Sequence, residues 1–450
     1  MDKWWKNKEI RRQAVFMIIV PLLGLLALIL VHLLPTEPMR EHLYWSLDMI
    51  EEEFDDELLI DGFKATLTGS FTDCLMLEHA VYAGGHSVPE QVLHMYRAES
   101  YYDAYDPSAW HPGESLVDYL SGNAAPREVE YSRYWHGYLI VLKPLLLITS
   151  FNSIRLFNAA LQLLLVGICL ILMTGKRQNG LAWSFLCSIP FLYYVSTYAS
   201  LSQSICLYLM LLTVISLLQL DEHLEEKQSY GIFFLLVGMF TSYFDFLTYP
   251  IVTLCYPLSI YLYVHGENVR GDMKKIVHFS LEWAMGYLWM WASKWILADI
   301  LSDCTTVKNA VDTIFTRTQS ADGYGRAGGF LKVIQLNISP YLNWGYILFG
   351  VLILFGMIIA AIKNGKPFWN KKRVNLLPFV TVALIPFAWW FVTQNHSEQH
   401  WVFTCRIFAA TVFALLAGVG KGIFPYRRDT YPCMRKGGKD ETLFHCPASR

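Results

Sequence analysis

The chain is poor in charged side chains, which make up 16% of its 450 residues, whereas 54% of the residues are hydrophobic. In an ordinary soluble domain about a quarter of the residues are charged, so this composition excludes that class. The formal net charge is −2, which leaves no excess of positive charge for binding nucleic acid. The sequence also has no internal repeat and no heptad pattern, so neither a solenoid nor a coiled coil is expected.

A disulfide framework is also absent, although the chain has nine cysteines. Five of them fall inside apolar segments, where cysteine acts as a small core residue. Cys74 and Cys304 are both expected on the outer side of a membrane and could pair, but nothing in their spacing requires it. Cys433 and Cys446 have only His445 nearby, which is too few ligands for a zinc site.

Long apolar runs are the main feature of the sequence, and a helix needs about 20 such residues to cross a hydrocarbon core of about 30 Å. The first run, 13–34, is not followed by a small-residue cleavage pattern, so we interpret it as a retained anchor. The predicted fold class is an all-α polytopic membrane protein with about 10 transmembrane helices and a large extracytoplasmic first loop that carries short surface helices. The predicted spans are 13–34, 156–174, 181–197, 203–220, 231–244, 249–264, 277–300, 343–363, 375–393 and 403–423.

Lysine and arginine beside the spans predict the orientation, because cytoplasmic loops carry an excess of both residues. The N-terminus is basic, whereas the short loops near 198–202, 245–248 and 394–401 contain no Lys or Arg. Both termini are therefore expected in the cytoplasm. Counting the apolar piece 138–150 as a crossing would invert every later loop, so we interpret it as a re-entrant or surface-lying helix at the outer leaflet.

This topology predicts an integral protein of a bacterial plasma membrane with its active site outside the cytoplasm. Its parts are a cytoplasmic N-terminus with the first span (1–34), an extracytoplasmic loop with surface or re-entrant helices (35–155), a transmembrane bundle (156–424) with a second outer loop (301–342), and a cytoplasmic tail (425–450).

Ionisable and polar aromatic residues gather at the predicted outer face. Charges inside a membrane are costly and are usually functional or paired. Several cations together suit a phosphate, which Arg binds in bidentate fashion and Lys as a point charge. The candidate substrate-binding residues are Arg133, Tyr134, His136, Lys143, Arg155, Asp245, Tyr249, Lys294, His396, His400 and Arg406.

Some of these residues have simpler explanations. Arg155 and Arg406 would also be explained by snorkelling toward lipid headgroups. Lys294 would serve as an interfacial anchor, and Asp245 as a helix cap. His396 and His400 would share one helical face and could bind a metal together with Glu398, but the pattern lacks the Glu and the third ligand of a known zinc motif. No metal site is predicted, no cofactor is required, and a divalent cation is compatible with these residues.

Asp73 is the candidate catalytic base, because an acid among cations suits deprotonation of an acceptor hydroxyl. It stands apart from the acidic run 48–61 and is followed by Leu75, Met76 and Leu77, which could dock it on the bilayer. The alternative is that Asp73 belongs only to the start of a helix over 72–83.

In the order and sidedness of Asp73, Arg133-Tyr134, Lys143-Pro144 and Arg155, the chain resembles the GT-C superfamily of polytopic glycosyltransferases. In that family an acid in the first outer loop acts as base, and basic side chains meet the phosphate of a polyprenyl-phosphate-linked sugar. The resemblance implies an inverting glycosyltransferase with such a donor and a hydroxyl acceptor on a cell-surface glycan, a lipid or a protein. It also implies that the piece 138–150 contributes to a groove for the isoprenoid chain.

Two other functions remain open. A transporter or flippase of a lipid-linked saccharide would explain the short segments within 231–264 and the intramembrane Glu282, although internal repeats are typical of that class. A surface-glycan polymerase or ligase would share the lipid-linked substrate.

Overall fold

A computed structural model describes residues 8–52, 57–100, 111–122, 127–302, 304–320, 325–363 and 375–424. The described chain is almost entirely helical, which confirms the all-α class. The exception is a small antiparallel sheet, in which β1 (Arg97–Glu99) pairs with β2 (Arg127–Val129). The predicted cytoplasmic tail, 425–450, lies outside the described residues.

Among the described residues, five helices are long and apolar enough to cross a membrane by length and composition. They are α1 (Lys8–His32), α8 (Phe151–Gly175), α11 (Leu201–Glu226), α17 (Trp344–Lys363), and α20 (Trp401–Thr404) continued through η5 (Cys405–Ile407) into α21 (Phe408–Ile423).

The other predicted spans are also helical, but they are shorter, broken or richer in charge, so their crossing of a membrane remains a prediction. They are α9 (Asn179–Ser188) with η3 (Ile189–Leu192) and α10 (Tyr194–Thr197), α12 (Tyr230–Phe244), α13 (Val252–His265), α14 (Val269–Leu301) and α18 (Leu377–Val392).

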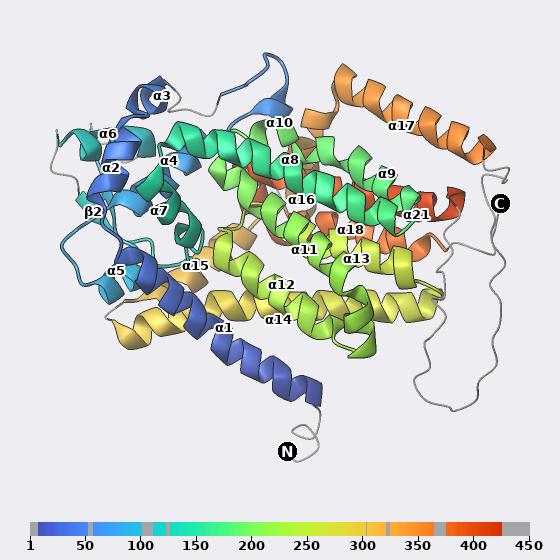
Figure 1. The fold of residues 1–450 in the computed structure, drawn as a ribbon, viewed down its shortest axis with the longest axis horizontal. Helices are drawn as coiled ribbons and strands as arrows, with labels where there is room; N and C mark the ends of the chain where they lie inside the picture. Colours follow the sequence, from blue (N-terminus) through green and yellow to red (C-terminus); the bar gives the residue numbers. More distant parts are fainter. Residues whose placement is uncertain are drawn as a thin grey trace, which may run out of the picture.

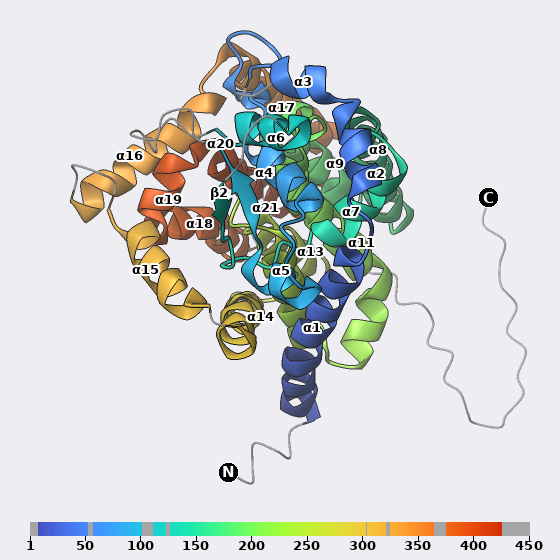
Figure 2. The ribbon, with the colours of Figure 1, turned by 90° about the vertical axis from the view of Figure 1, so that its left-hand side faces the viewer.

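The remaining elements gather mainly at one end of the helical bundle, on the left of Figure 1 and facing the viewer in Figure 2. They include α7 (Leu139–Ile148), which corresponds to the apolar piece 138–150. It has ten residues and is about 15 Å long, half the thickness of a hydrocarbon core. These elements are α2 (Glu37–Tyr44), α3 (Leu47–Glu52), η1 (Lys64–Thr66), α4 (Ser70–Val81), α5 (Val88–His94), α6 (Pro112–Ser121), α7 (Leu139–Ile148), α15 (Thr306–Thr318), α16 (Arg326–Ile338), η4 (Ser339–Tyr341) and α19 (Gln394–Gln399).

One hydrophobic core joins these end elements to the bundle. Buried residues of α4 and α7, such as Leu77 and Leu142, pack in one cluster with Leu28 of α1 and Met290 of α14. The described parts of 35–138 are therefore packed onto the helices rather than held away from them.

Helices α12 and α14 approach each other closely through two glycines. A Cβ atom on Gly238 would lie 2.0 Å from the Trp283 carbonyl oxygen, and one on Gly286 would lie 2.0 Å from the Leu235 carbonyl oxygen. Small residues at such crossings let two backbones pack directly, as is common between membrane helices. The two contacts are reciprocal, so a side chain at either position would force the two helices apart.

We expect Gly286→Ala to lower the stability of the protein by about 1–3 kcal/mol, the usual cost of overpacking a tight interface. Gly167→Ala in α8 is the matched control, because nothing lies within 4 Å of a Cβ at that position. Thermal unfolding of the purified protein in detergent would measure both. Equal melting temperatures for the two variants would contradict the close crossing.

Candidate functional site

The first turn of α11 is the point at which several of the predicted site residues meet. Leu201 N donates to Asp73 Oδ2 at 2.7 Å, and Ser202 N donates to Asp73 Oδ1 at 2.8 Å. The Ser200 hydroxyl donates to Asp73 Oδ1 at 3.0 Å. Asp73 itself lies in the first turn of α4, which begins at Ser70 rather than at the predicted Thr72. Its carboxylate therefore caps α11 and not its own helix.

Arg406 reaches the same turn of α11 from another direction. Its guanidinium donates hydrogen bonds to Gln203 Oε1, to Ser196 Oγ at 2.9 Å and to the Val402 carbonyl oxygen. It also lies 5.9 Å from the centroid of the Tyr249 ring, and the Tyr249 hydroxyl donates to the Gln203 carbonyl oxygen. The hydrogen-bond partners of this buried guanidinium are all uncharged.

Asp73 and Arg155 line the same small pocket, together with Ser70, Phe151 and Ala199. The pocket has a volume of about 20 Å³, enough for one water molecule but not for a sugar. Asp73 Oδ2 accepts only the Leu201 N–H among the described donors, so it keeps capacity for a further hydrogen bond. Burial raises the pKa of Asp73, and hydrogen bonds from Ser202, Leu201 and Ser200 oppose this shift.

An apolar groove lies beside this pocket, with a volume of about 330 Å³. Its walls come from α7, α8, α11 and α12, and include Val141, Leu145 and Phe157. Leu201 also lines the groove, so the residue whose backbone binds Asp73 belongs to the groove wall. Leu201 therefore links the wall of the groove to the candidate base.

The polar residues in the wall of the groove are hydrogen-bonded to one another. Asn158 Nδ2 donates to Ser204 Oγ at 2.9 Å, and the Tyr208 hydroxyl donates to Asn158 Oδ1 at 2.6 Å. Because these polar groups satisfy each other, the groove presents a mainly apolar surface to an occupant.

Asp245 and His396 organise the turn between α12 and α13. Asp245 accepts hydrogen bonds from the backbone N–H and the hydroxyl of Thr248, and burial raises the pKa of Asp245 to about 6. His396 Nε2 lies 2.7 Å from the Leu247 carbonyl oxygen, which fixes α19 against this turn. Both groups therefore serve to hold the turn that carries Tyr249.

His396 and His400 do lie close together, with ring centroids 4.7 Å apart. Burial lowers the pKa of both histidines, that of His400 to about 4, so both rings are neutral near pH 7. Glu398, however, forms an ion pair with Lys332 of α16. The Glu398 carboxylate is thus bound to Lys332 rather than gathered with His396 and His400 around one metal position.

Lys143 and Lys294 bind the ends of two helices of the predicted outer loop. Lys143 Nζ donates to the Ala80 carbonyl oxygen of α4 at 2.7 Å. Lys294 Nζ donates to the carbonyl oxygens of Val92 and Leu93 in α5, at 2.7 and 2.8 Å. A cation is favoured at the C-terminal end of a helix, where carbonyl groups lack partners. These lysines attach α4 and α5 to α7 and α14.

Arg133 and Tyr134 pack against α14 and α15. The Arg133 guanidinium donates to Asn309 Oδ1 at 2.8 Å. The backbone carbonyl oxygen of Arg133 accepts hydrogen bonds from the indoles of Trp291 and Trp295 at 2.9 Å each. The Tyr134 ring stacks on Trp291, with centroids 5.8 Å apart.

His136 lies in a buried aromatic cluster beside α4. Its Nε2 is 3.0 Å from the Tyr131 carbonyl oxygen, and its ring is 4.5 Å from that of His79. Burial lowers the pKa of His136 well below its ordinary value, so the ring is uncharged near neutral pH. The structure thus places His136 among packing contacts and away from the pocket that holds Asp73.

Glu78, in the same helix as Asp73, is a buried acid that sequence reasoning missed. Neither of its carboxylate oxygens has a hydrogen-bond partner among the described residues, and Arg97 Nη1 of β1 lies 3.7 Å from Oε2. Burial raises the pKa of Glu78 to about 8. The pair Glu78-His79 in a mainly apolar stretch of sequence could have indicated this buried acid. It was missed because only charges at the predicted membrane surface were considered as site residues.

A comparison of the chain with protein-family models, curated proteins and solved structures finds no match. The assignment of roles therefore depends on geometry. By that criterion Asp73, Tyr249 and Arg406 meet around the first turn of α11, whereas Lys143, Lys294 and His136 hold the surrounding elements together. Arg155 joins Asp73 in the lining of the small pocket.

Glu78 predicts a pH dependence of stability. Because its folded-state pKa lies above the ordinary 4.5, the folded protein holds a proton that the unfolded chain releases, so stability falls as pH rises from about 4.5 to about 8. Glu78→Gln should remove this loss, and its melting temperature should exceed that of the wild type more at pH 8 than at pH 5. The exposed Glu57→Gln is the control. An equal difference at both pH values would contradict the buried acid.

Proposed function

We propose that the protein is an inverting glycosyltransferase that moves a sugar from a polyprenyl-phosphate donor to a hydroxyl acceptor at the outer membrane face. The observation that carries the proposal is that Leu201 both lines the apolar groove and donates its backbone N–H to Asp73. A lipid chain in the groove would bring its phosphate end to the pocket lined by Asp73 and Arg155.

The proposed topology has ten crossings, both termini in the cytoplasm and a GT-C-like first outer loop. The gathering of the short elements at one end of the bundle supports this topology (Figure 1). So does the meeting of Asp73 and Arg406 at one turn, since both were assigned to the outer face from the sequence. In this proposal the left-hand end of Figure 1 faces the cell exterior or periplasm.

The isoprenoid chain of the donor fits the groove by chemistry. Ligand pockets commonly have volumes of about 300–1,000 Å³ and mainly apolar walls, and the groove has about 330 Å³. Several wall residues are themselves exposed on the lipid-facing side; Val141 is 53% exposed and Phe157 is 53% exposed. A chain could therefore enter from the bilayer without passing through water.

The reaction at the pocket would be a single displacement. Asp73 Oδ2 takes the proton of the acceptor hydroxyl, whose oxygen forms the new bond to the anomeric carbon. The bond from that carbon to the phosphate oxygen breaks, and the polyprenyl phosphate leaves with the electron pair. Arg155 stabilises the growing negative charge on the phosphate. The raised pKa of Asp73 favours its role as a base that works near neutral pH.

The pocket in this state is too small for a sugar, so substrate binding must move part of its wall. Met49 and Ile50 of α3 form the side of the pocket that comes from the first outer segment. Lys143 and Lys294 are left out of phosphate binding, because helix carbonyl groups already hold them. The phosphate contact is therefore assigned to Arg155, which lines the pocket together with Asp73.

Asp73→Asn should lower the rate of sugar transfer by about 100-fold or more, since a positioned general base contributes about 10²–10⁴-fold. The variant keeps one oxygen for the N-terminus of α11, so its stability should fall by only about 1 kcal/mol. The measurement is release of polyprenyl phosphate from a panel of polyprenyl-phosphate sugars.

Asp61→Asn is the matched control, because Asp61 is an exposed acid of the same outer segment. Full activity in Asp73→Asn would reassign the base. A melting temperature measured alongside separates loss of the base from loss of the fold.

Val141→Trp should fill part of the groove and raise the KM for a long-chain donor, while a donor with a short, water-soluble chain should be affected much less. Val351→Trp in α17 is the control, because Val351 is similarly exposed but lies outside the groove. Steady-state kinetics with both donors would test this. Equal KM values for the long-chain donor in the two variants would place the chain elsewhere.

A further inference from the structure

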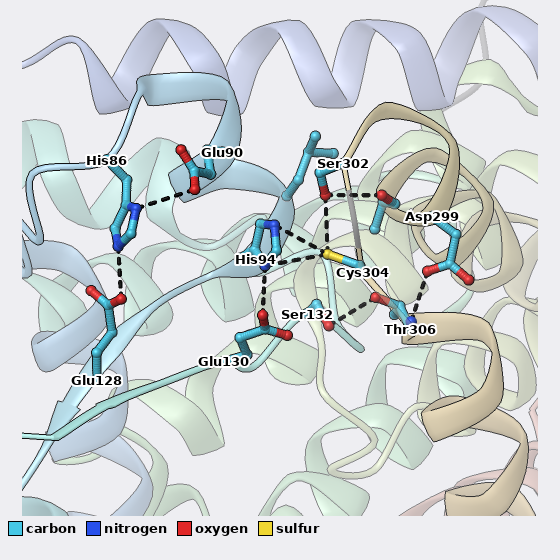
Figure 3. Close-up of polar contacts among 12 residues, drawn as sticks. His86, Glu90, His94, Glu128, Glu130, Ser132, Asp299, Ser302, Cys304 and Thr306 are labelled. Atoms are coloured by element: carbon cyan, nitrogen blue, oxygen red, sulfur yellow. Dashed lines mark hydrogen bonds and ion pairs between the residues drawn. The ribbon is translucent and has the colours of Figure 1, made fainter.

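His94, Glu130 and Cys304 form a cluster (Figure 3). His94 ends α5, Glu130 directly follows β2, and Cys304 lies between α14 and α15. His94 Nδ1 is 2.7 Å from Glu130 Oε1, and Cys304 Sγ is 3.3 and 3.4 Å from the two nitrogens of His94. One ligand atom from each residue lies within 4.8 Å of the other two.

The sulfur atom is a free thiol. The pairing of Cys304 with Cys74 that the sequence left open is thus not formed. Because Sγ is almost equally distant from both nitrogens of His94, it is not aligned with either one as a nucleophile is with its base. Binding of one shared metal ion therefore explains the cluster better than a Cys–His–Glu catalytic triad does.

The surroundings hold Cys304 in place. The Ser302 hydroxyl lies 3.1 Å from Sγ and also donates to the Ala298 carbonyl oxygen at 3.0 Å. Asp299 accepts hydrogen bonds from Thr306 N at 2.7 Å and from Val307 N at 3.1 Å, which caps the start of α15 (Figure 3). Partners of this kind fix the ligands of metal sites in their binding geometry.

His94 is fixed from two sides. Its ring stacks on Tyr96, with centroids 4.8 Å apart and planes 9° from parallel. The carbonyl groups that precede it, in Val92 and Leu93, bind Lys294 of α14. The contact between α5 and α14 therefore brings His94 to Cys304 independently of any ion.

We propose that His94, Glu130 and Cys304 bind one divalent cation of the zinc class. Thiolate, imidazole and carboxylate together are the ligand set that zinc accepts, whereas magnesium and calcium prefer oxygen alone. Binding releases the thiol proton, so the thiolate, the carboxylate and the cation sum to zero charge. A neutral site suits a position where His94 is largely buried.

Three protein ligands leave a fourth position of a tetrahedral zinc ion open. The side chain of Glu130 is 49% exposed, so that position and the entry path face solvent. The ion would link α5 and β2 to the segment that joins α14 to α15. This inference goes beyond the proposed transferase and does not depend on it.

The test uses the full chain purified in detergent, stripped with a chelator and reloaded with Zn²⁺ or Co²⁺ alone. We expect one ion per chain, and with Co²⁺ a thiolate-to-cobalt charge-transfer band in the near ultraviolet. Cys304→Ser should abolish that band, and His94→Gln and Glu130→Gln should weaken binding by more than the roughly 10–100-fold that loss of an outer partner costs.

Two variants serve as matched controls. Glu128→Gln changes a nearby carboxylate that binds His86 instead, and Cys187→Ser changes a buried thiol of α9; both should bind the ion as the wild type does. Glu130→Gln is the variant most compatible with folding, since its side chain is half exposed. Failure of the wild type to bind one ion per chain, or undiminished affinity in folded Glu130→Gln and Cys304→Ser, would overturn the proposal. Either result leaves the transferase assay unaffected.

Discussion

The end elements are attached to the bundle by charged side chains placed on helix ends of opposite polarity. The carboxylate of Asp73 receives the N–H groups that begin α11, whereas the ammonium groups of Lys143 and Lys294 receive carbonyl groups at the ends of α4 and α5. Each contact satisfies backbone groups that the helix cannot satisfy itself, and each matches the sign of the helix dipole. In an apolar environment an unsatisfied backbone group costs several kcal/mol. Together with the shared hydrophobic core, these contacts place α4 beside α11 and α7, and α5 beside α14.

This constraint also shapes the candidate base. A carboxylate that caps a helix is held in one orientation, so its remaining lone pair on Oδ2 points to a fixed place. An active site benefits from such a fixed group, because no reorganisation is needed when the proton is transferred. The same contact makes Asp73 structural, and the substitution of choice is therefore Asn, which keeps one acceptor for the helix. Stability and activity must be read together at this position.

The sequence indicated which isolated charged residues lie beside apolar segments, but not which groups bind them. Asp73 and Arg406 were identified because an isolated acid and an isolated cation beside apolar segments are costly. Their meeting at Ser200–Gln203 joins parts of the chain that are 127 and 203 residues apart, and no local pattern encodes such pairs. The same holds for Lys294 and Val92, and for Cys304 and His94, which are 202 and 210 residues apart. Helix positions were predictable from apolar runs of local sequence; partners across the fold were not.

Arg406 differs from the two lysines, because among the described residues it binds one backbone carbonyl group and two neutral side chains rather than the end of a neighbouring helix. Its hydrogen bonds lead instead through Gln203 and Ser200 toward Asp73. In the proposed reaction Asp73 loses its negative charge when it takes the acceptor proton, and at the same moment the departing phosphate gains one. The negative charge in the pocket that Arg155 lines then moves from the carboxylate to the phosphate without a change in its sum. A buried guanidinium with neutral partners is suited to this exchange, since a permanent salt bridge would favour the state before transfer over the state after it.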